Sequence, residues 1–292
     1  MTPSVELPQR ISRRRRPAHN DITVIDGLRT ASVGEDGSPR QALVFMGIMA
    51  WVEPFELQRL SVLAGAWNAR VAVVDVPGCG HGGARLTPSQ RRALRRGEFA
   101  PVARQMVHSA QAGNPRLRRE PVIVVGYSLG ASLAAAAVAD PGLMRVSGLM
   151  LVEPVALRRW RVSSLLRSVR SENEVVDDHV NQNHGLVAPP PRRGEPTPPW
   201  SRIDVAHLGY AVSRGRLGRD LITASQIQSF PVQVVHGIDS TLSRPGDVRR
   251  LVRRCRRARL DVRDMPVAGR HALWQSLSTV AELAERAGDM WD

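Results

Sequence analysis

The residue in this sequence best placed to do chemistry is a serine between two glycines. Ser128 stands at the centre of the pentapeptide GYSLG. The β-branched run Val122 to Val125 before it predicts a buried strand, and the alanine-rich segment after it predicts a helix. A strand, G-x-S-x-G and a helix together are the context of a nucleophile elbow, a sharp turn that exposes the serine hydroxyl. An ordinary strand-to-helix turn is the alternative interpretation.

A serine hydroxyl is a weak nucleophile at neutral pH, so its chemistry needs a base beside it. Histidine suits this role because its pKa is close to working pH, and a carboxylate must then orient the imidazole and stabilise the imidazolium. The sequence offers eight histidines. No set of histidines and carboxylates has the spacing of a metal site, so we expect neither a metal nor another cofactor.

Apolar runs that predict strands alternate with helical patterns along most of the chain. An expected β-hairpin at residues 22–33 is followed by buried strands at residues 41–46 and 70–76. Further strands are expected at residues 146–152 and 231–235, after the elbow and its helix. Strands that alternate with helices form parallel sheets with helices on both faces. The sequence therefore predicts an α/β fold with a mainly parallel sheet of about eight strands.

One region interrupts this alternation, because residues 153–230 contain no good strand. Two helical stretches in it flank a proline-rich link at residues 188–200, where dense prolines favour an extended connection. An insertion of this length, placed after the sixth strand, predicts a helical cap over the site. A disordered excursion without a role is the alternative. The expected parts are a disordered basic tail at 1–20, an α/β core at 21–153 and 230–292, and the cap at 154–229.

With these elements in place, the chain resembles the α/β-hydrolase fold superfamily over nearly its whole length. Besides GYSLG, three loops carry the resemblance: DVPGCGH at residues 75–81, VHGID at 235–239 and AGRH at 268–271. They are similar to the family's loop after the fourth strand, its acid-bearing turn and its histidine loop. The resemblance implies a serine, an acid and a histidine in that order along the chain. Ser128 is then the nucleophile, and His271 is the base because no other histidine follows that turn.

The acid has two candidates. The resemblance implies a carboxylate three residues after the glycine of VHGID, but that position is Ser240, and Asp239 lies one residue before it. A short turn variant would still present Asp239, which we prefer as the acid. Glu153, just past the strand that ends at Val152, is the alternative, because some members of the superfamily use that position. A solvated carboxylate at a strand end is the other interpretation of Glu153.

An oxyanion hole requires two N–H donors. The resemblance implies Leu129, directly after the nucleophile, and Ile48, in the loop after Met46. The family often has His-Gly before the second donor, where this chain has Met-Gly, but the donor itself is a backbone group. Apolar residues in this loop favour an apolar acyl or alcohol group. We expect Met49 and Tyr127 to contact the substrate.

Composition and charge bear on location and partners. No apolar run approaches the length of a transmembrane helix, and no apolar segment follows the arginines at 13–16, so we expect neither a membrane span nor a secretory signal. Two cysteines do not make a disulfide framework, which favours the cytoplasm. The net charge of +14 invites a nucleic-acid interpretation, but all 41 basic residues are arginines spread through the chain, as codon bias would produce. We expect no specific nucleic-acid partner.

Three classes of function remain. The first is a serine hydrolase that cleaves an ester or related acyl bond of a small molecule through an acyl-enzyme intermediate, without a cofactor. The same residues would serve an acyltransferase or a thioesterase. The second is a non-catalytic ligand-binding protein on the same fold, which the displaced Asp239 favours and the intact Ser128 and His271 disfavour. A polyanion-binding protein, motivated only by charge, would lose affinity steeply with salt. None of these hypotheses fixes the oligomeric state.

Overall fold

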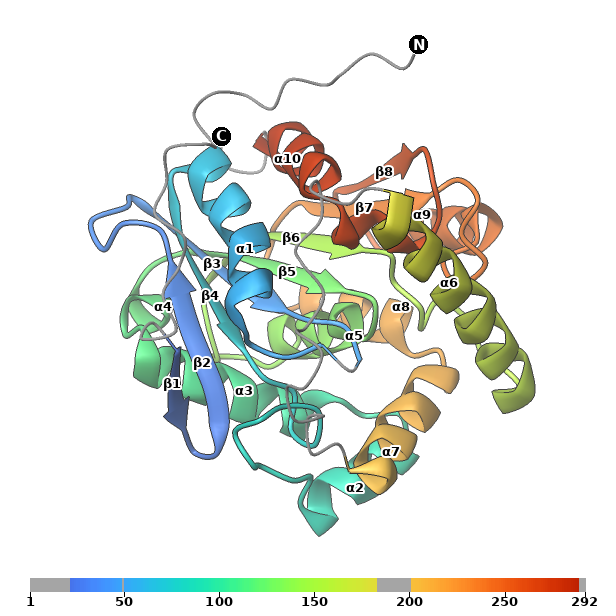
Figure 1. Cartoon of the computed structure of the whole chain (residues 1–292), viewed down its shortest axis with the longest axis horizontal. Helices are drawn as coiled ribbons and strands as arrows, with labels where there is room; N and C mark the ends of the chain where they lie inside the picture. Colours follow the sequence, from blue (N-terminus) through green and yellow to red (C-terminus); the bar gives the residue numbers. More distant parts are fainter. Residues whose placement is uncertain (1–21, 49, 183–200, 289–292) are drawn as a thin grey trace.

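The computed structural model describes residues 22–48, 50–182 and 201–288, and for residues 54–55 and 173–182 it describes the backbone alone. Within these ranges eight strands form one sheet in the order β1-β2-β4-β3-β5-β6-β7-β8 (Figure 1). β2 is antiparallel to β1 and β4, and the other neighbouring pairs are parallel. The strands are β1 (Ile22–Ile25), β2 (Leu28–Val33), β3 (Arg40–Phe45), β4 (Ala69–Val74), β5 (Val122–Tyr127), β6 (Val146–Val152), β7 (Val232–Gly237) and β8 (Val262–Val267). The expected sheet is confirmed.

The strands in the middle of the sheet are rich in β-branched residues, which favour buried strands. β5 reads VIVVGY, and all six of its residues are buried. Strands that are covered on both faces carry nearly continuous apolar sequence, and branched side chains pack well on a pleated surface. β5 lies between β3 and β6 and is parallel to both, so the loop after β5 opens in the middle of the sheet's carboxyl edge. In open α/β sheets that edge is where ligands bind.

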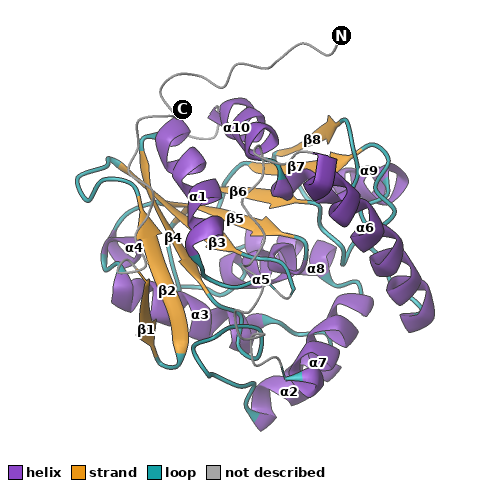
Figure 2. Cartoon of the chain, viewed as in Figure 1, coloured by secondary structure: helices purple, strands orange, loops and turns teal. Residues whose placement is uncertain are grey.

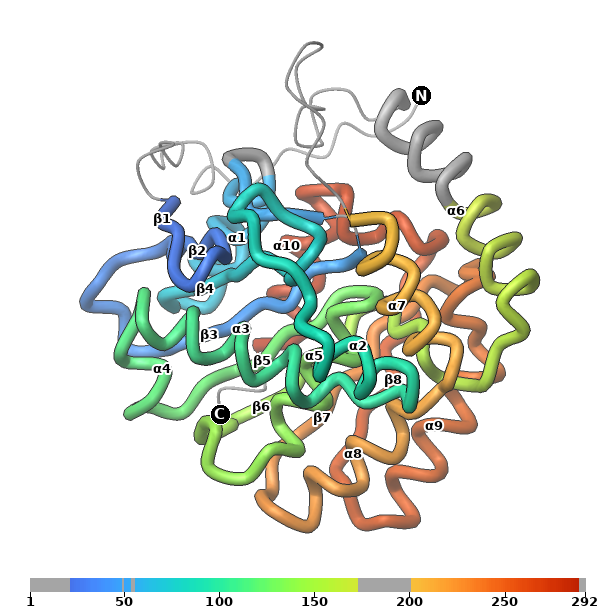
Figure 3. Tube along the Cα trace, turned by 90° about the horizontal axis from the view of Figure 1, so that it is seen from below, coloured from blue at the N-terminus to red at the C-terminus, as the bar shows by residue number. Residues whose placement is uncertain are grey.

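Helices cover both faces of the sheet (Figure 2). α1 and α10 pack against each other on one face. The other face carries α3, α5, α8 and α9 (Figure 3). α5 is alanine-rich and all ten of its residues are buried, because small side chains let the helix approach the sheet closely. These helices are α1 (Pro54–Trp67), α3 (Ala100–Gly113), α5 (Leu129–Val138), α8 (Leu217–Ser225), α9 (Pro245–Arg257) and α10 (Leu277–Arg286).

Some of the helical sequence is divided into shorter helices. The segment at residues 87–113 forms α2 (Pro88–Arg95) and α3, because Gly97 adopts a φ of +79°, which ends a right-handed helix. The last helical pattern forms a 3₁₀ helix, η2 (His271–Gln275), followed by α10. A single short turn, α4 (Arg116–Arg119), precedes β5.

The segment between β6 and β7 contains α6 (Val162–Gln182), α7 (Arg202–Ser213) and α8. α8 packs against α5 and α9, so it belongs to a helical layer of the sheet. α6 and α7, which we call the inserted helices, lie to one side of the sheet (Figure 1). The expected domain boundaries remain predictions. The proline-rich link at 188–200 and the basic tail at 1–20 lie outside the described residues.

Two further observations concern the chain as a whole. None of the helices that the structure describes is long and apolar enough to cross a membrane. Cys79 and Cys255 are both buried thiols.

Candidate active site

Ser128 lies in a strained turn between β5 and α5. Its backbone has φ +56° and ψ −115°, a conformation that non-glycine residues rarely adopt. The strain is held in place because Ser128 N–H donates to the carbonyl of Val152, at 2.9 Å. The turn also requires glycine two residues later, since a Cβ on Gly130 would overlap the carbonyl oxygen of Phe45. The sequence thus forms the predicted elbow, with the hydroxyl at the carboxyl edge of the sheet.

His271 reaches this serine from the loop after β8. Its Nε2 lies 3.0 Å from Ser128 Oγ, within hydrogen-bond distance. The relative exposures of the two residues are 7% and 8%, so the pair is largely shielded from water. A nucleophile and a base at this distance meet the first geometric requirement for covalent catalysis.

The other ring nitrogen of His271 is hydrogen-bonded to Glu153. Nδ1 lies 2.8 Å from Glu153 Oε2. Glu153 directly follows β6 with a φ of +51°, and it is completely buried. Burial alone would raise the pKa of this carboxyl, but hydrogen bonds from His271, Gly237 N–H and Ser240 Oγ hold the pKa below its ordinary value. Glu153 is therefore an anion that faces the histidine.

The structure reverses the preference for Asp239 as the partner of His271. Asp239 is exposed, and its backbone N–H donates to the carbonyl of Gly269. Ser240, at the position where the family resemblance implied an acid, donates its hydroxyl to Glu153 at 2.7 Å. The turn after β7 thus supplies hydrogen-bond donors to a carboxylate from the neighbouring strand. The physical reason is that β6 and β7 are adjacent and parallel, so their carboxyl ends meet.

Tyr127, expected to contact the substrate, supports the histidine. Its hydroxyl donates to the carbonyl oxygen of His271 at 2.9 Å. Its ring stacks on the rings of His271 and Trp274, with centroids 5.5 and 5.7 Å away. Burial raises the pKa of this phenol, so the hydroxyl stays protonated as a donor. Tyr127 also lines the cavity in front of Ser128, and its contact with substrate remains a prediction.

A cavity of about 310 Å³ opens in front of Ser128 and His271. Leu129 and Ile48, the expected oxyanion donors, both line it. Met49 lies outside the described residues. Most of the other lining side chains are apolar and come from loops at the carboxyl edge and from the inserted helices; they include Met46, Trp51, Val155, Leu165, Val169, Val212 and Leu242.

One side of this cavity carries a polar network that sequence reasoning missed. Glu56 and Arg59 on α1 form a buried ion pair. Trp274 Nε1 donates to Glu56 at 2.9 Å, and Arg59 donates to Gln275 Oε1 at 2.7 Å. The spacing of Glu56 and Arg59 predicts neighbours on one helix. No local sequence signal predicts their contacts with Trp274 and Gln275, which lie more than 200 positions away in the chain.

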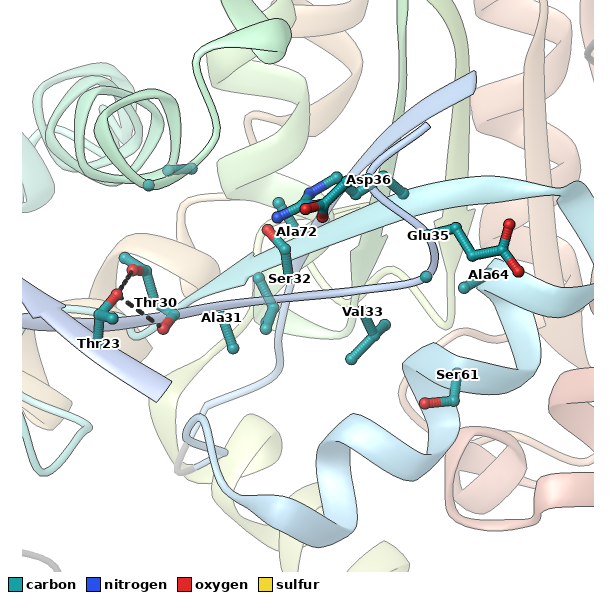
Figure 4. Close-up of a pocket in the computed structure, with 15 residues that line it drawn as sticks. Thr23, Thr30, Ala31, Ser32, Val33, Glu35, Asp36, Ser61, Ala64 and Ala72 are labelled. Carbon is teal, nitrogen blue, oxygen red and sulfur yellow. Dashed lines mark hydrogen bonds and ion pairs between the residues drawn. The ribbon is translucent and has the colours of Figure 1, made fainter. Parts of the chain in front are cut away.

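A larger hollow of about 520 Å³ lies beside β2 (Figure 4), and its lining does not include Ser128. Small and polar side chains line it, among them Thr23 and Thr30, whose hydroxyls are 3.0 Å apart. It contains no histidine to activate a hydroxyl. The smaller cavity, which is lined by both Ser128 and His271, is therefore the candidate active site. In the part of the chain that is described, no group of three His, Cys, Asp or Glu residues could hold a metal ion.

Comparison with known families agrees with the fold. A model described as the alpha/beta hydrolase family matches residues 46–286, well over half of the chain. The protein therefore belongs to the α/β-hydrolase family. The sequence matches none of the curated proteins with which it was compared.

Several solved hydrolases have the same fold. A lipase in its open form has a TM-score of 0.62, with 16% identity over 92% of this chain and 96% of that one. E-2-(acetamidomethylene)succinate hydrolase has a TM-score of 0.60 and 19% identity, over 91% and 96% of the two chains. The thioesterase domain from the curacin biosynthetic pathway has a TM-score of 0.58 and 18% identity, over 91% and 96%. At these identities the likeness shows the fold alone.

Proposed function

We propose that this protein is a serine hydrolase that cleaves an ester or related acyl bond of a small molecule. One observation carries the proposal: His271 lies between Ser128 Oγ, at 3.0 Å, and Glu153 Oε2, at 2.8 Å, in a single hydrogen-bonded chain. This is the arrangement that activates a serine hydroxyl on several unrelated folds. A protein that only binds a ligand does not need it.

The reaction follows from this geometry. Ser128 Oγ attacks the carbonyl carbon of the substrate while its proton passes to His271 Nε2. The tetrahedral intermediate collapses, the bond to the leaving alcohol breaks, and the alcohol takes the proton from Nε2. Water then attacks the acyl-serine, gives a proton to Nε2, and the acid is released as Ser128 regains that proton. Glu153 stays ionised throughout and stabilises the imidazolium.

The negative charge of the tetrahedral intermediate needs donors next to Ser128. Leu129 is the first residue of α5, so its N–H is one of the groups that a helix start leaves without an intrahelical partner. Ile48, from the loop after β3, is the proposed second donor. Both residues line the cavity with Ser128, which supports this assignment. The N-terminal end of α5 adds a favourable dipole.

The cavity favours an apolar acyl or alcohol group. Its walls are mainly aliphatic, and part of them comes from α6 and α7, which we propose act as a cap. The same catalytic residues can act on a thioester in place of an ester. An alcohol or an amine can also take the place of water in the attack on the acyl-serine. Hydrolysis of thioesters and acyl transfer are therefore variants of this proposal. The chemistry requires no cofactor. A cytoplasmic location stays a prediction, supported by the buried thiols of both cysteines.

A panel of p-nitrophenyl esters with acyl chains of increasing length, together with matching acyl thioesters, tests the proposal. We expect turnover of at least one series by the wild type and none by Ser128→Ala. Circular dichroism of the variant confirms that it is folded. Turnover that persists in folded Ser128→Ala would contradict the proposal.

A further inference from the structure

Glu172 is a carboxylate on an inserted helix that reaches the loops around Ser128 and His271. It lies on α6, outside the layers that cover the sheet, and its relative exposure is 1%. Its Oε1 accepts hydrogen bonds from the backbone N–H and the hydroxyl of Thr241, both at 2.6 Å. Its Oε2 accepts the backbone N–H of His271 at 3.2 Å. One side chain thus joins the loop after β7 to the loop after β8.

The polar contacts of His271 show how Glu172 bears on the position of this histidine. Its ring nitrogens face Ser128 and Glu153, and its carbonyl accepts from Tyr127, all of which belong to the sheet or its edge. Its backbone N–H is the one polar group that is held from an inserted helix. The Thr241 loop also carries Ser240, which donates to Glu153. Glu172 therefore contacts both loops that set the position of the histidine ring.

The chemistry of the side chain argues against a role in packing alone. A buried carboxylate is costly unless donors and countercharge surround it, so an apolar residue would fill the same space more cheaply. Here the guanidinium of Arg270 lies 3.5 Å away, and three donors point at the two oxygens. A carboxylate has two acceptor oxygens, so it can accept hydrogen bonds from both loops at the same time.

We propose that Glu172 is a positioning residue that holds His271 in register with Ser128 and so couples the placement of α6 to the reaction. This inference rests on the proposed serine hydrolase function. In Glu172→Gln the amide has only one acceptor oxygen, so it can accept from Thr241 or from His271, but its NH₂ group faces the other donor. Glu172→Ala loses all of these bonds.

The test measures kcat, KM and the rate of labelling by a fluorophosphonate, beside the thermal unfolding temperature. Small displacements of catalytic groups are costly, so we expect kcat and the labelling rate to fall roughly tenfold to a hundredfold in Glu172→Ala, and less in Glu172→Gln. KM should change little. A packing role alone would lower the unfolding temperature without selectively lowering the labelling rate of the folded protein.

Asp204→Asn is the matched control. Asp204 is a fully buried carboxylate on α7, the other inserted helix. It pairs with Arg91 of α2 at 2.8 Å and accepts the backbone N–H of Leu86, so its partners differ from those of Glu172. We expect this variant to lose stability while it keeps most of the labelling rate. Equal losses of labelling in folded Glu172 and Asp204 variants would overturn the inference.

The remaining outcomes are also decisive. Failure of both Glu172 variants to fold would overturn the inference, because Glu172 would then be needed for the fold and not for orientation. A wild type that is labelled and a Ser128→Ala variant that is not would uphold the proposed function, whatever the Glu172 variants do. A folded wild type that neither reacts with the probe nor turns over esters would overturn both.

Discussion

The carboxylate of Glu153 lies 2.8 Å from Nδ1 of His271, although the two residues are 118 positions apart in the chain. The sheet creates this contact. Ser128 follows β5, Glu153 follows β6 and His271 follows β8, and the strands from β5 to β8 are adjacent and parallel. Their carboxyl ends therefore bring Ser128, Glu153 and His271 to one edge of the sheet.

The identity of the acid is tested by two matched substitutions. Glu153→Gln should lower kcat by about ten-thousandfold, because an uncharged partner no longer stabilises the imidazolium or fixes its tautomer. Asp239→Asn should leave kcat close to the wild-type value, since Asp239 is exposed. Steady-state kinetics on one ester decides between them. A large loss in Asp239→Asn with near-normal Glu153→Gln would show that the acid is misassigned.

The close packing of the elbow makes a stability prediction. Gly130→Ala places a methyl group on the carbonyl of Phe45 and should destabilise the protein by at least about 2 kcal/mol. Gly246, also helical, has open space around its Cβ position, so Gly246→Ala should be neutral or stabilising by up to about 1 kcal/mol. Urea unfolding of the two variants measures the difference. A tolerated Gly130→Ala would mean that the elbow is looser than described.

Asp75 predicts a pH dependence of stability. Burial raises its pKa from 3.8 to about 7, while its Oδ1 accepts the N–H of Val52 at 2.6 Å. A raised pKa in the folded state gives stability that is fully present below the unfolded pKa and is lost as the pH rises through the folded pKa. Between about pH 4 and pH 7 the wild type should lose up to about 1.4 kcal/mol per pH unit relative to Asp75→Asn.

Unfolding both proteins in urea at several pH values between these limits gives that difference directly. The sloping difference is the signature of one titrating group, so a constant offset between the two proteins would rule out a buried, protonated Asp75.

Two neighbouring leucines on α6 test the cavity. Leu165 lines the cavity and has a relative exposure of 7%, whereas Leu166 is 63% exposed. Leu165→Ala should shift the ratio of kcat/KM values towards longer acyl chains by about tenfold, because it enlarges an apolar pocket. Leu166→Ala should leave the chain-length profile unchanged. The same profile in all three proteins would indicate that the acyl group binds elsewhere.

Much of this arrangement was predictable from local sequence. The β-branched runs predicted the sheet, and GYSLG between a strand and a helix predicted the turn that carries Ser128. His271 followed from chain order within a recognised family pattern. The signals for the strands and for the turn each lie within a short stretch of sequence, where periodicity and turn chemistry act.

The parts that were missed depend on contacts between distant segments. The resemblance of VHGID to an acid-bearing turn favours Asp239, although Asp239 lies one residue early. The carboxylate that faces His271 is Glu153, which has a backbone φ of +51°, and no local sequence signal reveals this contact. Nothing in the sequence around Glu172 distinguishes it from other acidic residues on helices. Only the fold brings it to Thr241. Such contacts are properties of the packed sheet and its loops.

The central claim is that Ser128 is an activated nucleophile. The most direct test is the intact mass of the purified protein after treatment with a fluorophosphonate. We predict one covalent adduct in the wild type, located on Ser128, none in Ser128→Ala and a much slower reaction in His271→Ala. A folded wild type without an adduct, or an adduct that persists in Ser128→Ala, would contradict it.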